Sequence, residues 1–564
     1  MQLNGARILI ECLIREGVNI IFGYPGGSVL DIYDELPQYG EQLRHVLVRH
    51  EQAAVHAADG YARATGKVGV CMATSGPGAT NTVTGIATAY CDSIPMVIFT
   101  GQVPTGLIGN DAFQEVDIAG ITRPCTKHNY VVKDVKELAK VVRQAFYLAR
   151  SGRPGPVLVD LPKNVLQGSA EFVWPEDVSL RSYNPTYRPI TPDPQGRGRA
   201  LQCGAPPAVR RRRRDHVQRQ RRVPQSRQES EHPGDLFPDG PRRVPLRSPA
   251  VARHARYARD LCRQQGRQQR RPPDCRGRAL RRPRDRTPLL LCAPRPPSSI
   301  STSTPRPSTR TSTCVSPWWA TAAIRWSPSA NTSPPANRSP WKERFAAWQG
   351  QLDEWRQEQP ITWTPGETTI KPQEVIKAVD KITEGKAILT TEVGQHQMWA
   401  AQLYNFTEPR TLLTSGGLGT MGYGFPAAIG AQFAYPNKLV IDVSGDGSFQ
   451  MNLQELITAV SNKLPVKVLL LNNGCLGMVR QLQDLFYGGR LNAVDIPDQP
   501  DFVKLAEAYG AEGYRVAKLE DLESTLRTAF ASPNTAIIDV IVERDENVYP
   551  TVPSGASLDE MLLL

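Results

Sequence analysis

The residues with the clearest chemical potential are Gly445-Asp446-Gly447 and, further along the chain, Asn472-Asn473. Asp446 offers a charged oxygen and Asn473 a neutral amide oxygen, which are the ligands that Mg²⁺ prefers; Mg²⁺ also recruits phosphate oxygens to complete its coordination. The two glycines let the backbone approach a phosphate group closely. A single Gly-Asp-Gly is usually only a turn, so the prediction of a magnesium and diphosphate site depends on the asparagine pair that follows it.

Strand-like runs at 439–443 and 466–471 precede these two groups, and an amphipathic helical pattern at 453–460 lies between the runs. This order predicts a strand–turn–helix–strand unit. In such units the turn at the carboxyl end of a strand presents ligands to a phosphate.

Residues 1–190 also alternate helical and strand patterns, which predicts an open α/β sheet. Strands are expected at 45–48, 68–73, 95–100 and 157–161, and a helix at 79–90. The motif His50-Glu51-Gln52-Ala53-Ala54 follows the first of these strands and opens a helix that runs through Tyr61, so Glu51 would sit in its first turn. Taken alone, Glu51 is explained by the preference of acidic side chains for the first turn of a helix.

Length and composition limit the possible functions. A chain of 564 residues should hold about three to four domains. It has no apolar run long enough to span a membrane, and no signal-peptide pattern is evident at its N-terminus, so a cytoplasmic enzyme without membrane contact is expected. The ten cysteines include no CxxC pair, which favours reduced thiols.

The net charge of +12 comes from one segment. Residues 196–340 contain 32 Arg, no Lys and 8 acidic residues, a net charge of +24, so the rest of the chain carries −12. The segment also holds 22 of the 48 prolines, and no helical or strand period continues through it. Without a periodic apolar surface, little offsets the conformational entropy lost on folding, about 1–2 kcal/mol per residue.

Three interpretations of residues 196–340 remain open. The segment could be an arginine-rich arm that binds nucleic acid, although such arms use lysine as well as arginine. It could be a low-complexity linker, although linkers of this length are rare within compact enzymes. It could also be an out-of-frame translation of GC-rich DNA, in which Arg and Pro codons accumulate and the A-rich Lys codons disappear. We favour the third interpretation and therefore expect no nucleic-acid partner.

The readable parts of the chain resemble the large catalytic subunit of acetolactate synthase (acetohydroxyacid synthase), a family of thiamine diphosphate enzymes. The resemblance covers residues 1–190 and 341–564. It rests on ordered motifs: YPGGS at 24–28, HEQAA at 50–54, SGPGATN at 75–81, GQVP at 101–104, DAFQE at 111–115, GRPGPVLVDLPK at 152–163, VGQHQMW at 393–399, SGGLGTMGYGFPAAIGA at 415–431, GDGSFQMN at 445–452 and NNGCLGMVRQ at 472–481.

The resemblance implies three doubly wound parallel-sheet domains. The N-terminal domain (1–190) would bind the pyrimidine of the coenzyme and the C-terminal domain (341–564) its diphosphate and Mg²⁺. The central domain (191–340) would bind FAD, but its sequence is unreadable here. The frame hypothesis explains this: the family-like string YVGGGAIT, read one base out of frame, gives VRRRRRDH, which stands at 209–216.

The resemblance also assigns roles to individual residues. Glu51 would contact the aminopyrimidine of the coenzyme and drive its activation, and Gln114 and Lys163 would act on the substrate. The remaining assignments fall into cofactor, metal and substrate-channel groups. They are Gly394, Gln395, His396, Met421, Gly445 and Gly447 for thiamine diphosphate, Arg153 for FAD, Asp446, Asn473 and the Cys475 carbonyl for Mg²⁺, and Gly27, Val103, Pro104, Phe113, Val479 and Leu482 for the channel.

The implied reaction decarboxylates pyruvate and joins the remaining two-carbon unit to a second 2-oxo acid, pyruvate or 2-oxobutyrate, on the route to branched-chain amino acids. Implied partners are a second copy of the chain, as a homodimer or larger assembly, and a small regulatory subunit. Leu482 departs from the family, which usually has Trp there. The alternatives are a pyruvate oxidase or another 2-oxo acid decarboxylase, or an inactive cofactor-binding protein if residues 196–340 are real.

Overall fold

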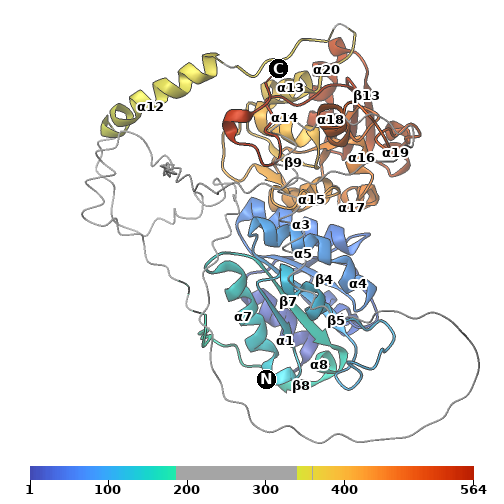
Figure 1. Ribbon diagram of the computed structural model, residues 1–564. Coiled ribbons are helices and arrows are strands. Elements are labelled where there is room, and N and C mark those ends of the chain that lie inside the picture. Colours follow the sequence, from blue (N-terminus) through green and yellow to red (C-terminus); the bar gives the residue numbers. More distant parts are fainter. Residues whose placement is uncertain (184, 186–338, 359, 367, 564) are drawn as a thin grey trace, which may run out of the picture. The chain divides into compact units, whose positions relative to one another are not determined.

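The computed structural model describes residues 1–183, 185, 339–358, 360–366 and 368–563 (Figure 1). Residues 186–338, where the central FAD-binding domain is expected, lie outside this part of the chain. The described residues form two α/β domains, each built on a six-stranded sheet whose paired strands all run parallel. The prediction of doubly wound parallel sheets is therefore confirmed for the N- and C-terminal domains.

The N-terminal sheet has the strand order β3-β2-β4-β5-β7-β6. Its strands are β2 (Ile20–Gly23), β3 (Arg44–Leu47), β4 (Gly69–Ala73), β5 (Met96–Gln102), β6 (His128–Val131) and β7 (Pro156–Pro162), and a separate antiparallel pair joins β1 (Gln2–Asn4) to β8 (Ser169–Glu171). The helices are α1 (Gly5–Arg15), α2 (Leu30–Glu35), α3 (Glu51–Thr65), α4 (Pro77–Asn81), α5 (Val83–Asp92), α6 (Ile118–Thr122), α7 (Leu138–Arg150) and α8 (Lys163–Gln167), with 3₁₀ turns η1 (Leu36–Tyr39), η2 (Arg123–Cys125) and η3 (Val135–Glu137).

Burial on both faces explains why the strands of this sheet read as continuous apolar runs. Every residue of β5 and β7 is buried. One apolar cluster packs α1 and α7 against the sheet, and a second cluster packs α3 and α5 against it. Parallel strands covered on both faces have this composition because neither face meets water.

The C-terminal sheet has the order β10-β9-β11-β12-β14-β13. Its strands are β9 (Ile388–Thr391), β10 (Leu412–Thr414), β11 (Val440–Gly445), β12 (Lys467–Asn472), β13 (Glu512–Val516) and β14 (Ala536–Ile541). The helices are α12 (Ser339–Glu358), α13 (Pro372–Thr383), α14 (Gln395–Leu403), α15 (Gly424–Ala434), α16 (Asp446–Phe449), α17 (Leu456–Ser461), α18 (Gly477–Phe486), α19 (Phe502–Ala508) and α20 (Leu519–Ala531), with 3₁₀ turns η5 (Leu453–Glu455) and η6 (Leu558–Glu560).

The strand order reverses direction between β2 and β4 in the first sheet and between β9 and β11 in the second. In open α/β sheets the crevice at the carboxyl ends of the strands beside such a reversal is the usual ligand site. The second reversal lies between the strands that lead to Gly394 and to Asp446.

The predicted strands lie within two residues of the observed ones, but two predicted helices are interrupted. The helix expected at 79–90 is divided at Thr82 into α4 and α5, and the helix expected after Gly447 is divided into η5 and α17. The helix predicted to open near Glu51 is α3. It begins where the His50 imidazole accepts a hydrogen bond from the amide of Gln52, and it ends at Gly66, whose φ of 74° is left-handed.

Glycines allow α3 and α15 to approach each other closely. A Cβ atom on Gly60 of α3 would lie 2.2 Å from the carbonyl oxygen of Ala427, and one on Gly430 of α15 would lie 1.9 Å from that of Ala57. The Tyr423 hydroxyl, just before α15, donates a 2.7 Å hydrogen bond to the buried carboxylate of Asp59. The helix that begins with Glu51 therefore packs against the helix that follows Met421.

Candidate active site

A cavity of about 80 Å³ lies at the carboxyl edge of the second sheet. Most of its lining comes from three segments: 393–396 after β9, 445–448 after β11, and 473–479 after β12. The residues assigned from the sequence that line it are Gly394, Gln395, His396, Met421, Gly445, Asp446, Gly447, Asn473, Cys475 and Val479. The fold thus brings together residues that lie far apart in the sequence.

The Asp446 carboxylate is the acidic group of this pocket and is only 1% exposed. Its Oδ2 atom accepts a 2.9 Å hydrogen bond from the amide of Gly474 and a second one from Gln499 Nε2. Burial raises the pKa of Asp446 above its usual range, although these hydrogen bonds oppose the shift. A divalent cation beside the carboxylate would favour its charged form and reverse the effect of burial.

Asn473 and Cys475 follow on the neighbouring strand. The amide oxygen of Asn473 accepts a 3.2 Å hydrogen bond from the backbone N–H of Cys475, which fixes the turn between them. Burial raises the pKa of the Cys475 thiol to about 11, so the sulfur stays protonated and is a poor metal ligand at neutral pH. The backbone carbonyl oxygen is then the atom of Cys475 that suits Mg²⁺.

Three buried side chains of the pocket have polar atoms without a partner among the described residues: His396 through Nε2, Gln395 through Oε1 and Trp399 through Nε1. Burial lowers the pKa of His396 to about 4, so its imidazole is neutral at pH 7 and can donate one hydrogen bond. The Nε2 atom of the Gln395 amide donates hydrogen bonds of 2.8 Å to Gln481 Oε1 and 2.9 Å to the carbonyl of Glu546, which fixes the side chain.

Buried polar atoms without partners are costly, by about 1–3 kcal/mol each, unless a ligand supplies the missing bond. A phosphate oxygen suits an imidazole N–H, and the free oxygen of Gln395 suits a donor such as water. Among the residues that the structure describes, no group of three or more His, Cys, Asp or Glu side chains could hold a metal alone. One carboxylate and one amide therefore fit a Mg²⁺ ion whose coordination is completed by a diphosphate.

Several of the N-terminal residues assigned from the sequence lie at the carboxyl edge of the first sheet. Gly27 follows β2, Glu51 follows β3, Val103 follows β5 and Lys163 follows β7. The Lys163 ammonium donates a 3.1 Å hydrogen bond to the carbonyl of Gly27, so two of these residues are in direct contact. Val103 is buried, and its neighbour Pro104 is half-buried.

Glu51 is 8% exposed, and its Oε2 atom accepts a 2.9 Å hydrogen bond from Asn81 Nδ2. Gly78 leaves room for this carboxylate, because a Cβ there would lie 3.1 Å from Glu51 Oε1. In the SGPGATN motif, then, Gly78 and Asn81 accommodate the glutamate of HEQAA. Glu51 is not among the residues that line the pocket of Asp446.

The other assigned residues are exposed or lie apart from the pocket. Phe113 is 88% exposed, and Gln114 beside it has a left-handed φ of 58°. Leu482 is exposed on α18, one turn beyond Val479, and does not line the pocket. Arg153 precedes β7, at the amino edge of the first sheet, and donates a 2.7 Å hydrogen bond to the Ser93 hydroxyl.

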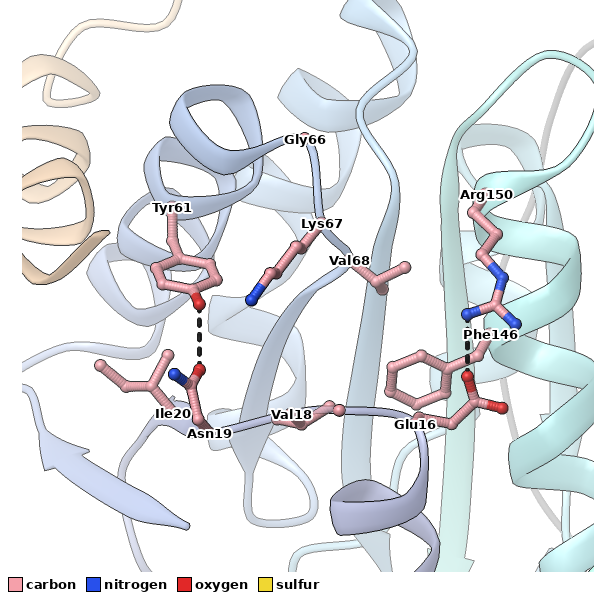
Figure 2. Close-up of a pocket in the computed structure, with 11 residues that line it drawn as sticks. Glu16, Val18, Asn19, Ile20, Tyr61, Gly66, Lys67, Val68, Phe146 and Arg150 are labelled. Atoms are coloured by element: carbon pink, nitrogen blue, oxygen red, sulfur yellow. Dashed lines mark hydrogen bonds and ion pairs between the residues drawn. The ribbon is translucent and has the colours of Figure 1, made fainter. Parts of the chain in front are cut away.

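A second hollow, of about 280 Å³, lies in the N-terminal domain (Figure 2). Asn19, which accepts a 2.9 Å hydrogen bond from Tyr61, and Val68 line it just before β2 and β4 begin. An ion pair of 2.9 Å between Arg150 and Glu16 closes one side. The hollow is at the amino ends of the strands, the edge opposite to the one where open α/β sheets bind ligands. It shares no residue with the predicted site.

Sequence reasoning missed several side chains that support the pocket. Gln499 contacts Asp446 from the loop before α19, and no periodic or motif signal marks it. Gln481 could have been found, because it ends the NNGCLGMVRQ motif and lies on α18, one turn after Gly477. Glu392 directly precedes the VGQHQMW motif and is completely buried.

The comparisons identify the class of protein. Residues 3–121 match the thiamine pyrophosphate enzyme N-terminal TPP binding domain, and residues 392–540 match the C-terminal TPP binding domain of the same enzymes. The two matches contain the first sheet's Glu51 and the whole pocket lining up to Val479. The chain is thus built as a thiamine pyrophosphate enzyme.

Its relatives narrow this class to one family. The chain is 42% identical over 590 aligned residues to the acetolactate synthase isozyme 3 large subunit of Escherichia coli (strain K12), covering 100% of this chain and 99% of that protein. It is 39% identical to the acetolactate synthase large subunit of Haemophilus influenzae, covering 100% and 98%, and 40% identical to the acetolactate synthase of Mycobacterium bovis, covering 99% and 91%. The chain belongs to the acetolactate synthase large subunit family.

The resemblance noted from the motifs is thereby confirmed, and with it the prediction of a thiamine-diphosphate-dependent enzyme. No helix in the described ranges is long and apolar enough to cross a membrane.

Proposed function

We propose that this chain makes acetolactate with thiamine diphosphate and Mg²⁺ held in the pocket at the carboxyl edge of the second sheet. Asp446, the amide oxygen of Asn473 and the carbonyl of Cys475 would hold the metal. The observation that carries the assignment is the set of buried polar atoms around it: His396 Nε2 and Gln395 Oε1 have no partner among the described residues, and both side chains line the same pocket as Asp446.

Thiamine diphosphate, when bound, supplies a carbon nucleophile that attacks the keto carbon of pyruvate and takes up the electron pair left by departing CO₂. The chain's own residues position it and control protons. His396 would donate a hydrogen bond to the diphosphate, and Gly394, Gly445 and Gly447 keep the backbone close to it. Met421, half-buried on the pocket wall, would support the organic rings.

Substrate binding would fall to the carboxyl edge of the first sheet. The Lys163 ammonium, held at the Gly27 carbonyl, offers a positive charge for the carboxylate of pyruvate or 2-oxobutyrate. Gln114 would add an amide, and Val103, Pro104 and Phe113 would give the channel apolar walls. From the C-terminal domain, Val479 and Leu482 of α18 would add the remaining wall of this channel.

Glu51 would exchange a proton with the aminopyrimidine of the coenzyme. Because Glu51 does not line the pocket of its own chain, we infer that it serves the pocket of a second copy. The active unit is then a homodimer or a larger assembly with two equivalent sites. A small regulatory subunit completes the assembly, since the relatives are named large subunits.

FAD and the central domain belong to the same proposal. Arg153, exposed at the amino edge of the first sheet, would contact FAD. The frame hypothesis places the rest of the FAD site in residues 191–340 of the correctly read gene. Mass mapping of tryptic peptides from the native source tests it: glycine-rich α/β peptides should replace the arginine-rich ones of the present sequence.

We propose a cytoplasmic location for the enzyme.

Mixing two inactive variants tests the shared site. Glu51→Gln should lose the proton carrier and Asp446→Ala the metal ligand, so each homodimer should be inactive. If equal amounts of the two variants exchange subunits freely, half of all dimers contain one copy of each variant. Each of these dimers has one intact site of its two. Acetolactate formation from pyruvate should then recover to about a quarter of the wild-type rate.

Three results of this experiment would contradict the proposal in different ways. No recovery after proven subunit exchange would refute the shared site. Full activity of either single variant would refute the role of that residue. Acetate or acetaldehyde as the wild-type product, in place of acetolactate, would refute the reaction itself.

A further inference from the structure

Two of the segments that line the pocket, 393–396 and 445–448, and the loop that carries Met421 are linked by one side chain that does not line it. Glu392 is completely buried and has no role in the reaction outlined above. It directly follows β9 and precedes Val393 and Gly394, which begin the first lining segment. Its backbone N–H donates a 3.1 Å hydrogen bond to the carbonyl of Val443 in β11, which holds it beside the strand that leads to Asp446.

The carboxylate of Glu392 binds the segment that carries Met421. Its Oε2 atom accepts a 2.6 Å hydrogen bond from the backbone N–H of Gly422, and its Oε1 atom accepts a 3.1 Å bond from that of Phe425. The carbonyl of Gly422 is held in turn by Asn452 Nδ2 at 2.6 Å. The residue next to Met421 is thus bound on both its donor and its acceptor sides.

The same carboxylate reaches the Gly-Asp-Gly turn. The hydroxyl of Ser448, two residues after Asp446, donates a 2.7 Å hydrogen bond to Glu392 Oε2. Ser448 also lines the pocket. These three hydrogen bonds to the Glu392 side chain come from N–H or O–H donors, so the side chain acts as an acceptor. They oppose the effect of burial, which raises the pKa of Glu392 to about 7.

We propose that Glu392 is a positioning residue for the cofactor site: one buried carboxylate that fixes the spacing between the segment of Gln395 and His396, the loop of Met421 and the turn of Asp446. This inference rests on the proposed function, because it assumes that these three segments bind thiamine diphosphate and Mg²⁺. Some side chains do not touch a metal or ligand but orient the side chains that do. Removing one of them typically lowers affinity or activity by about 10–100-fold.

Glu392→Gln tests the role with little change of shape. The amide keeps one acceptor oxygen, but its NH₂ group must face one of the three donors. Ser448→Ala removes a single link and leaves Glu392 in place. Glu35→Gln is the matched control: Glu35 lies in the N-terminal domain, is 8% exposed and also accepts bonds from three side chains, those of Asn4, Arg7 and Gln38.

The measurement is the Kd of thiamine diphosphate for each full-length variant in Mg²⁺ by titration calorimetry, with melting temperatures recorded beside it. We expect Kd to rise about 10–100-fold for Glu392→Gln and less for Ser448→Ala, and to stay unchanged for Glu35→Gln. The KM for thiamine diphosphate should rise more than the KM for pyruvate, which a general loss of stability would not produce.

Unchanged cofactor affinity in Glu392→Gln and Ser448→Ala would overturn the proposal, as would an equal loss in the Glu35→Gln control. If Glu392→Gln does not fold, Ser448→Ala decides, since it deletes only a hydroxyl. Failure of the wild-type chain to bind thiamine diphosphate would instead refute the proposed function, so the two ideas fail in distinguishable ways.

Discussion

Gly424→Ala should damage the pocket although the residue does not line it. A Cβ at Gly424 would lie 2.3 Å from Asp442 Oδ1 and 2.5 Å from the backbone nitrogen of Glu392. The backbone of Glu392 cannot rotate away, because it is paired with β11. Such overpacking costs typically about 1–3 kcal/mol. Moving the start of α15 also stretches the bonds from Gly422 and Phe425 to Glu392, each worth about 1.5–3 kcal/mol when the acceptor is charged.

We therefore expect the Gly424→Ala variant to lose about 3 kcal/mol of stability in the C-terminal domain, since the two costs act together and are partly relieved by adjustment. At about 2–4 °C per kcal/mol for a domain of this size, the melting temperature should fall by roughly 6–12 °C. The Kd for thiamine diphosphate should rise in parallel, because the shift separates Met421 from Asp446.

Gly416→Ala provides the control in the loop that leads to Met421. The nearest atom to its added Cβ, Asp92 Oδ1, would be 4.0 Å away, and Gly416 does not have a positive φ. A substitution of this kind usually stabilises by about 0.4–1 kcal/mol. Calorimetric melting of both variants, with and without cofactor, tests whether Gly424→Ala lowers the melting temperature while Gly416→Ala does not. Equal melting temperatures, or a Gly424→Ala variant that melts higher than the wild type, would refute the reasoning.

Three further predictions address the metal, the pH dependence and the substrate. Asp446→Asn should weaken binding of thiamine diphosphate by about 100-fold in calorimetric titrations with Mg²⁺, because the carboxylate that the described residues contribute to the pocket loses its charge; unchanged affinity would exclude Asp446 as a ligand. Burial raises the pKa of Asp160 to about 7 despite bonds from Thr100 and Gln102, so the folded chain retains a proton that the unfolded chain releases near pH 4. The free energy of unfolding should then fall by on the order of 4 kcal/mol as pH rises from about 4 through about 7. The urea midpoint of the Asp160→Asn variant should not show this decline with pH. Leu482→Trp should increase the share of 2-aceto-2-hydroxybutyrate when pyruvate and 2-oxobutyrate compete, by adding an aromatic wall to the channel; an unchanged product ratio would contradict the channel assignment.

The sheets could be predicted because parallel strands buried on both faces are recognisable as short apolar runs. The runs at 95–100 and 466–471 correspond to β5 and β12 with shifts of one or two residues at their ends. The pocket residues were recognisable for a related reason: Asp446 and Asn473 directly follow strands, where a parallel sheet presents its ligands. Local sequence was sufficient wherever strand and ligand are adjacent in the chain.

Contacts between distant segments could not be predicted in this way. Glu392 is bound by Gly422, Phe425 and Ser448, and neither spacing nor composition marks a buried carboxylate that binds both the segment after Met421 and the turn after Asp446. The interruption at Thr82 was missed for a local reason. The apolar pattern continues through it, but the chain bends where the Thr82 hydroxyl donates a 2.6 Å hydrogen bond to the carbonyl of Ala79.

The separation of Glu51 from the Asp446 pocket bears on the proposed homodimer. HEQAA and GDGSFQMN lie in one chain, yet each stands at the carboxyl edge of its own sheet, and the pocket lining includes Asp446 but not Glu51. Moving Glu51 into that pocket would mean releasing its bond to Asn81 and displacing α3, whose Gly60 allows close contact with α15. In the proposed homodimer, a second copy would supply the missing carboxylate without disturbing either contact. The same close packing that stabilises one chain therefore favours an active site shared between two.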